Sequence, residues 1–309
     1  MPNPALTAVL APVITPVQSK REPCIERLAR YCQWLLNEGV GLAIIGTNSE
    51  GNSMAVRQKR VCLYGLLEKG PPANQFMPGT GDCSLDDAIE LTRACLSAKV
   101  TSVLMLPPFY YKNVSDDGLF AFFSDVIQTL GDAQLQVYLY NIPQVSQVKL
   151  SVDLLERLVK AYPDTVAGMK DSSGDWAYTE SCIHRLSPMG FRVYAGSETF
   201  LLQTLRAGGV GCISATANVN PGAIARLASQ WTSDQADAMQ ANLDAVRKVF
   251  QSRPMIAAMK AAVAHGIHDP QWCELLAPLQ ALDQTETESL LAELSALEFS
   301  ITSYPSKEQ

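Results

Sequence analysis

Short apolar runs alternate with amphipathic stretches along the first two thirds of the chain. Each run ends in a polar or glycine-containing turn, which is typical of buried strands. The eight runs cover residues 6–14, 41–46, 75–81, 102–108, 135–142, 165–171, 191–196 and 209–216. Segments with helical periodicity lie between them, and Ser84 and Ser151 stand where two such helices would begin, each followed by acidic residues. The pattern therefore predicts a repeated strand–helix unit.

Continuous apolar strands that alternate with helices indicate a parallel sheet covered by helices. Eight such units predict an α/β fold in which residues 1–220 form a catalytic, closed (β/α)8 TIM barrel. A doubly wound open sheet is the alternative, but the turn TPVQSK (15–20) after the first run lacks the glycines of a phosphate loop. Strand signals stop after residue 220. Residues 221–309 are predicted to be a C-terminal helical region, packed on the barrel or forming a small domain, with a frayed tail at 302–309.

Composition narrows the range of partners. The chain has 309 residues, 47% of them hydrophobic, and a net charge of -7 without a cluster of lysine or arginine, which argues against nucleic acid. Its eight cysteines are scattered, with no CxxC motif, as expected of reduced thiols in a cytosolic protein. The N-terminus resembles no signal peptide, and no apolar run has the length of a membrane span. We therefore expect a cytoplasmic protein with neither a nucleic-acid nor a membrane partner.

The chemistry of an α/β barrel lies at the carboxyl ends of its strands. The three histidines, His184, His265 and His268, fall outside these positions. Most catalytic metal sites and a Ser-His-Asp triad need such histidines, so neither is expected. The strand ends offer instead a lysine, several tyrosines and small hydroxyl residues.

Lys170 closes an apolar run in VAGMKDSSGD (166–175). Burial disfavours an ammonium group, and a neutral amine can attack a ketone to form an iminium, which is an electron sink for a neighbouring C–C bond. A tyrosine such as Tyr140 can shuttle the protons, and Thr47 and Asn48, on a strand-to-helix turn, suit a substrate carboxylate. Position alone leaves three structural explanations open. The ammonium group of Lys170 can reach solvent while its methylene groups are buried. The tyrosines can be ordinary core residues. GTNSEG (46–51) can be a capped helix start.

Several stretches, in order, resemble the dihydrodipicolinate synthase / N-acetylneuraminate lyase superfamily of class I aldolases over residues 5–300. They are GTNSEGNS (46–53), GTGD (79–82), PPFYYK (107–112), YNIP (140–143), GMKDSSGD (168–175) and GVGCISATANV (209–219). The resemblance implies that Lys170 forms a Schiff base with pyruvate or another 2-oxo acid. It implies that Tyr140 shuttles protons and that Thr47 and Asn48 grip the carboxylate. No metal and no organic cofactor are implied.

The same resemblance implies an assembly. Tyr110 matches an aromatic residue that family members insert into the neighbouring subunit's site, so a homodimer or homotetramer is expected.

Departures from the family patterns bear on the substrate. Val145 stands where dihydrodipicolinate synthases carry an arginine for the second substrate's carboxylate, and valine cannot replace a guanidinium. SET (197–199) and Ala215 replace residues of the sialic acid lyases. Asn48, GMKDSSGD and AGSETFLL (195–202) look most like 4-hydroxy-2-oxoglutarate and 2-dehydro-3-deoxy sugar acid aldolases.

Further candidates for contact with substrate follow from this comparison. Ser172 is a candidate partner of the aldehyde half, and Ser197 and Ile213 are further candidate substrate-binding residues. Ser49 replaces the glycine usual in the carboxylate turn, which we expect to narrow the site or redirect an amide.

The sequence thus predicts a Schiff-base-forming lyase that cleaves or forms a 4-hydroxy-2-oxo acid, with pyruvate and an aldehyde as small-molecule partners. Three alternatives remain. The same lysine iminium serves a dihydrodipicolinate synthase-like reaction and a 4-deoxy-oxo sugar acid dehydratase or hydratase-aldolase. The third is a non-catalytic barrel that binds a 2-oxo acid.

Overall fold

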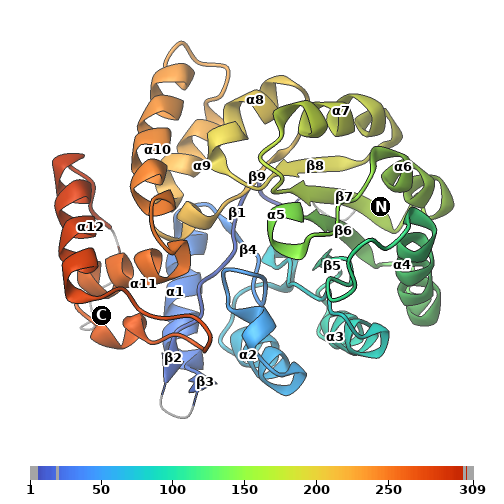
Figure 1. Cartoon of the computed structure of the whole chain (residues 1–309), viewed down its shortest axis with the longest axis horizontal. Helices are drawn as coiled ribbons and strands as arrows, with labels where there is room; N and C mark the ends of the chain where they lie inside the picture. Colours follow the sequence, from blue (N-terminus) through green and yellow to red (C-terminus); the bar gives the residue numbers. More distant parts are fainter. Residues whose placement is uncertain (1–5, 19–20, 302–303, 305–309) are drawn as a thin grey trace.

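One parallel sheet forms the centre of the molecule. The computed structural model describes residues 6–18, 21–301 and 304 (Figure 1). Seven strands hydrogen-bond in the order β4-β1-β9-β8-β7-β6-β5. Their bounds are β1 (Val9–Ala11), β4 (Gly41–Leu42), β5 (Ser102–Met105), β6 (Gln136–Asn141), β7 (Val166–Asp171), β8 (Arg192–Ala195) and β9 (Gly211–Ile213). A separate antiparallel pair joins β2 (Val17–Gln18) to β3 (Glu22–Pro23).

Residues 76–79 close the sheet into a barrel. Phe76 forms a parallel bridge with Leu42 of β4, and Gly79 forms one with Leu104 of β5. The Met77 N–H donates to the Leu42 carbonyl at 2.8 Å. The predicted run 75–81 thus takes the eighth strand's place, as isolated bridges rather than a continuous strand. The α/β barrel prediction is confirmed.

Helices surround the sheet (Figure 1). Those that follow the strands are α1 (Ile25–Asn37), α2 (Val56–Glu68), α3 (Leu85–Ser97), α4 (Asp116–Leu130), α6 (Val152–Ala161), α7 (Trp176–Leu186), α8 (Leu201–Arg206) and α9 (Pro221–Ser229), with a short α5 (Pro143–Ser146) after β6. The Ser84 hydroxyl accepts the Asp87 N–H at 3.2 Å, and the Ser151 hydroxyl accepts the Leu154 N–H at 3.0 Å. These contacts confirm both predicted helix starts.

Side chains of the strands alternate between two apolar layers. On β6, Tyr138 and Tyr140 belong to the cluster inside the barrel, whereas Val137 and Leu139 pack outward under the helices. Since both faces of a parallel sheet are covered, its strands read as continuous apolar runs. The alternation also fixes which strand residues face the barrel interior.

Most of the C-terminal region that the structure describes is helical. It contains α10 (Ala236–Gln251), α11 (Met255–Gly266) and α12 (Gln284–Ala296), which lie together on one side of the barrel (Figure 1). Because α9 continues the alternation directly after β9, a boundary at residue 220 stays a prediction. The predicted frayed tail lies outside the described residues except for Tyr304. None of the described helices is both long and apolar enough to cross a membrane.

Candidate active site

A cavity of about 410 Å³ opens at the carboxyl ends of the strands. It brings together predicted residues from four different turns or strand ends: Lys170, Tyr140, Thr47, Asn48, Ser172 and Ser197. The sequence places these residues up to 150 positions apart, between Thr47 and Ser197. Parallel strands end at one rim of the barrel, which is why residues so distant in sequence meet there.

Lys170 and Tyr140 are direct neighbours in the sheet. They are register partners across β6 and β7, and the Lys170 Nζ lies 4.4 Å from the centroid of the Tyr140 ring. The two residues are only 3% and 4% exposed. No hydrogen bond or ion pair joins Lys170 to any described residue. A buried ammonium without an ionic partner is costly, so a purely structural role gives a poor account of this lysine.

The carboxylate that is adjacent to Lys170 in the sequence is held by other residues. Asp171 follows Lys170 directly, so the two side chains leave the strand on opposite faces. The Asp171 carboxylate accepts the Asn141 amide at 2.8 Å and the Ser173 hydroxyl at 2.9 Å, and it also accepts the Thr179 hydroxyl. These bonds stabilise the end of β7 and leave Lys170 without a counter-ion.

Residues 46–53 form a tight turn that presents Thr47 and Asn48 to the cavity. The N–H groups of Ser49 and Gly51 both donate to the Gly46 carbonyl, at 3.1 and 3.0 Å. Within the described part of the chain, the N–H groups of Thr47 and Asn48 donate to no acceptor. Two free amides, a hydroxyl and a carboxamide are donors suited to a carboxylate.

Ser49 does not line the cavity. It is fully buried, and its hydroxyl donates to the Val13 carbonyl. The side chain of Ser49 therefore does not narrow the cavity, because it packs against the end of the first predicted strand. The alternative, that Ser49 redirects an amide, stays a prediction.

Three residues singled out in the sequence lie away from this cavity. Tyr110 is 73% exposed and its ring packs edge-on against Tyr111 at 5.2 Å, outside the cavity of its own chain. Ile213 is buried in the apolar cluster inside the barrel. Val145 is exposed. The roles assigned to Tyr110 and Ile213 remain predictions.

Arg247 of α10 borders the cavity, although the sequence pattern did not single it out. Its Nη1 donates to Glu198 at 2.8 Å and to the Ser214 hydroxyl at 3.0 Å. Glu198 is itself buried, lies outside the cavity lining and also accepts the Thr216 hydroxyl. Gln251 shares the face of α10 with Arg247 and borders the same cavity. The spacing of four residues between Arg247 and Gln251 predicts that both lie on one face of a helix. It does not predict which part of the molecule that face contacts.

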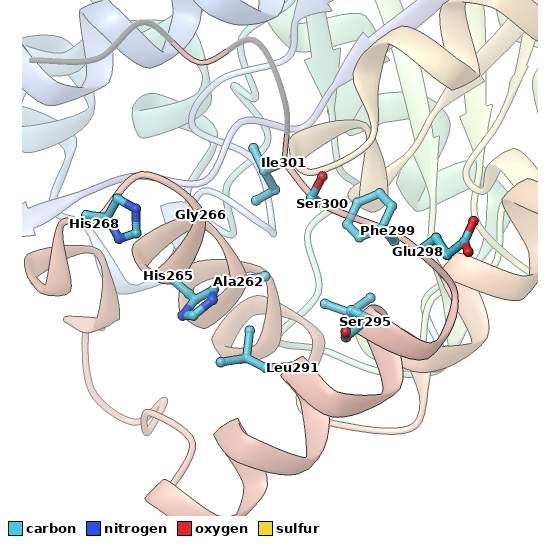
Figure 2. A pocket seen from close by; sticks show the side chains of 11 residues that line it. Ala262, His265, Gly266, His268, Leu291, Ser295, Glu298, Phe299, Ser300 and Ile301 are labelled. Atoms are coloured by element: carbon cyan, nitrogen blue, oxygen red, sulfur yellow. The ribbon is translucent and has the colours of Figure 1, made fainter.

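A second cavity of about 450 Å³ lies between α11, α12 and residues 298–301 (Figure 2). It contains His265 and His268, whose ring centroids are 6.5 Å apart, and none of the predicted site residues. Over the described residues, no three His, Cys, Asp or Glu side chains are grouped so as to hold a metal ion. The cavity at the strand ends is therefore the candidate active site.

Known proteins resemble this chain over nearly its whole length. A DapA-like lyase of Chloroflexus aurantiacus, itself uncharacterized, is 31% identical over 288 residues, which are 92% of this chain and 94% of that protein. The dihydrodipicolinate synthase of Agrobacterium tumefaciens superposes with a TM-score of 0.87 at 30% identity, covering 94% of this chain and 99% of that one.

More distant structures share the fold. A variant of the Sulfolobus solfataricus 2-keto-3-deoxygluconate aldolase has a TM-score of 0.84 at 20% identity, with 94% and 96% of the two chains covered. The model of the dihydrodipicolinate synthetase family matches residues 5–297, nearly the whole chain. The chain therefore belongs to the dihydrodipicolinate synthetase family, whose members are class I aldolase lyases.

Proposed function

We propose that the protein is a Schiff-base-forming aldolase that cleaves or forms a 4-hydroxy-2-oxo acid, with pyruvate as the product or the nucleophile. The observation that carries the proposal is Lys170, buried without an ionic partner against the ring of Tyr140 and beside the free amides of Thr47 and Asn48. An amine nucleophile, a proton carrier and a carboxylate grip are the groups that this reaction needs.

In the first step the substrate carboxylate binds at Thr47 and Asn48, and its 2-oxo carbon lies within reach of Lys170. The neutral amine attacks that carbon to form a carbinolamine. Tyr140 gives its proton to the carbinolamine hydroxyl, which leaves as water. This gives the iminium, with the nitrogen of Lys170 bonded to C2, and leaves Tyr140 as a phenolate that can accept the next proton. Burial in the barrel mouth protects the iminium from early hydrolysis.

In the second step the C3–C4 bond breaks, and its electron pair moves into an enamine on the Lys170 nitrogen. The 4-hydroxyl gives its proton to Tyr140 as the aldehyde forms. Protonation of the enamine at C3 and addition of water to C2 release pyruvate and free Lys170. Carbon–carbon synthesis follows the same steps in reverse.

The far end of the cavity would receive the aldehyde half. Ser172, Ser197 and Arg247 border the cavity and supply hydroxyl and guanidinium donors. Gly196 makes room for Ser172, because a Cβ on that glycine would lie 1.9 Å from the Ser172 hydroxyl oxygen. This polar lining supports a hydroxylated or anionic aldehyde. Val145, exposed where synthases carry an arginine, argues against the dihydrodipicolinate synthase reaction.

The exposed pair Tyr110 and Tyr111 supports an assembly of at least two subunits. Large aromatic side chains left in water at a barrel mouth are typical of a surface that a partner covers. We infer that Tyr110 enters the neighbouring subunit's site. We expect the Tyr110→Ala variant to form a smaller assembly than the wild type in light scattering.

A substrate panel with separate detection of pyruvate and aldehyde tests the proposed reaction. Release of both products identifies an aldolase, and loss of water without cleavage identifies a dehydratase. The panel includes pyruvate with aspartate semialdehyde, so that a synthase-like reaction is also detected. Binding of pyruvate that Lys170→Ala leaves unchanged, with no turnover of any substrate, would indicate a non-catalytic barrel.

A second lysine provides the matched control. Lys149 is exposed, and its Nζ lies 4.9 Å from the centroid of the Tyr178 ring. We expect Lys149→Ala to retain activity and Lys170→Ala to abolish it. Equal turnover by the Lys170→Ala variant and the wild type would contradict the proposal.

A further inference from the structure

A fully buried ion pair lies directly behind the turn that carries Thr47 and Asn48. The Lys260 ammonium of α11 contacts one carboxylate oxygen of Glu50, and both side chains have no exposed surface. The second carboxylate oxygen accepts the Leu276 N–H at 2.5 Å. Lys260 also donates to the Glu274 carbonyl at 2.7 Å. Both oxygens of Glu50 are therefore fixed by the C-terminal region.

Stability alone gives a weak account of this pair. Burial lowers the pKa of Lys260, and the neighbouring Glu50 only partly offsets that effect. Replacing a buried ion pair by apolar residues of similar volume is often neutral or even stabilising. We therefore explain the ion pair between Glu50 and Lys260 by the backbone geometry that it fixes rather than by its contribution to stability.

Glu50 controls the shape of the turn through its backbone. Its φ is 60°, in the left-handed region that non-glycine residues rarely adopt, and Ile45, just before the turn, has a φ of 65°. The Glu50 N–H donates to the Thr47 carbonyl at 3.1 Å. Such a conformation persists when the surroundings fix it, and here the buried carboxylate of Glu50 does so.

We propose that Glu50 and Lys260 are positioning residues, which hold the N–H groups of Thr47 and Asn48 in the direction that a substrate carboxylate requires. This inference rests on the proposed function. The C-terminal region thereby serves the barrel site from two sides, because Met255, at the start of α11, borders the cavity while Lys260 fixes the turn behind it.

Trapping of two ketones at Lys170 tests the inference. Pyruvate carries the carboxylate that the turn would bind, whereas hydroxyacetone has the same methyl ketone without a charge. The concentration of each ketone is varied in the presence of borohydride, and the adduct on Lys170 is measured by mass spectrometry. A hydrogen bond to a charged group contributes about 1.5–3 kcal/mol, so we expect Lys260→Met and Glu50→Gln to raise the half-trapping concentration of pyruvate about ten- to a hundredfold. That of hydroxyacetone should stay within about twofold.

A second ion pair of the same region is the matched control. Arg27 and Asp269 join α1 to the segment after α11 at 2.8 Å, and their side chains are 18% and 6% exposed. Arg27→Met therefore removes a mostly buried ion pair without touching the turn. We expect this variant to keep the wild-type preference for pyruvate over hydroxyacetone.

The double variant Glu50→Gln/Lys260→Met guards against misfolding, because it leaves no unpaired buried charge. We expect it to fold and still lose the preference for pyruvate. A folded double variant with the wild-type preference, or equal weakening of both ketones, would overturn the positioning role. Absence of any Lys170 adduct in the wild type would instead overturn the proposed function, so the two failures are distinguishable.

Discussion

In the proposed mechanism, Tyr140 determines how an iminium on Lys170 reacts. Its ring lies against the lysine, and its phenol belongs to the inner face of the barrel at the cavity. The ring shapes the pocket around the amine, and in the proposed mechanism the hydroxyl carries protons. These two contributions are separable, because phenylalanine keeps the first and removes the second.

We therefore expect Tyr140→Phe to form the pyruvate adduct on Lys170 but to cleave a 4-hydroxy-2-oxo acid about 10²- to 10⁴-fold more slowly, as is typical when an acid–base group is removed. Borohydride trapping measures the adduct, and single-turnover release of aldehyde measures cleavage. Cleavage at the wild-type rate would show that another group carries the proton.

At the scale of elements, the turn 46–53 depends on backbone packing that few residues tolerate. A Cβ on Gly51 would lie 2.0 Å from the Ile45 carbonyl oxygen, whereas a Cβ on Gly46 would meet nothing within 4 Å. The turn has no regular helix or strand except the short 3-10 helix η2 (Gly51–Ser53). Its geometry therefore comes from these close approaches and from Glu50.

Gly51→Ala should thus lower the free energy of unfolding by about 1–3 kcal/mol, the usual cost of overpacking, and weaken pyruvate trapping. Gly46→Ala, in the same turn, should change the free energy of unfolding little. Urea unfolding of both variants measures the difference. Equal stability of the two variants would show that the turn relaxes more easily than its contacts indicate.

Most helices and strands could be predicted from the sequence. The residues that the C-terminal helices contribute to the candidate site could not. Strands buried on both faces read as apolar runs, and their order places Lys170, Tyr140 and Thr47 at one rim. Residues 75–81 were predicted as a strand because they are apolar, although only isolated bridges form. Arg247 and Lys260 lie on helices after the last strand, and local periodicity does not determine which face meets the barrel.

At the scale of the whole molecule, packing governs how the cysteines respond to pH. All eight are free thiols, and only Cys83 is classed as exposed. Burial raises the pKa of Cys62, Cys95 and Cys182 to about 12, above the usual value near 9. Below about pH 9 these thiols are protonated in both the folded and the unfolded chain, so they do not make stability depend on pH.

Between about pH 9 and about pH 12 the unfolded chain loses these thiol protons while the folded chain keeps them. The free energy of unfolding should therefore fall as the pH rises through this range. Urea midpoints at about pH 8 and about pH 10.5 measure the fall, and Cys62→Ala should make it shallower. A midpoint that stays constant over this range would contradict the burial of these thiols.

The proposed role of Lys170 as the nucleophile can be tested by covalent trapping of pyruvate. The wild-type protein is incubated with pyruvate, reduced with borohydride and digested, and its peptides are identified by mass. We expect a reduced pyruvyl adduct on Lys170, with none on the exposed Lys149. An adduct on another lysine, or none in protein that binds pyruvate, would contradict it.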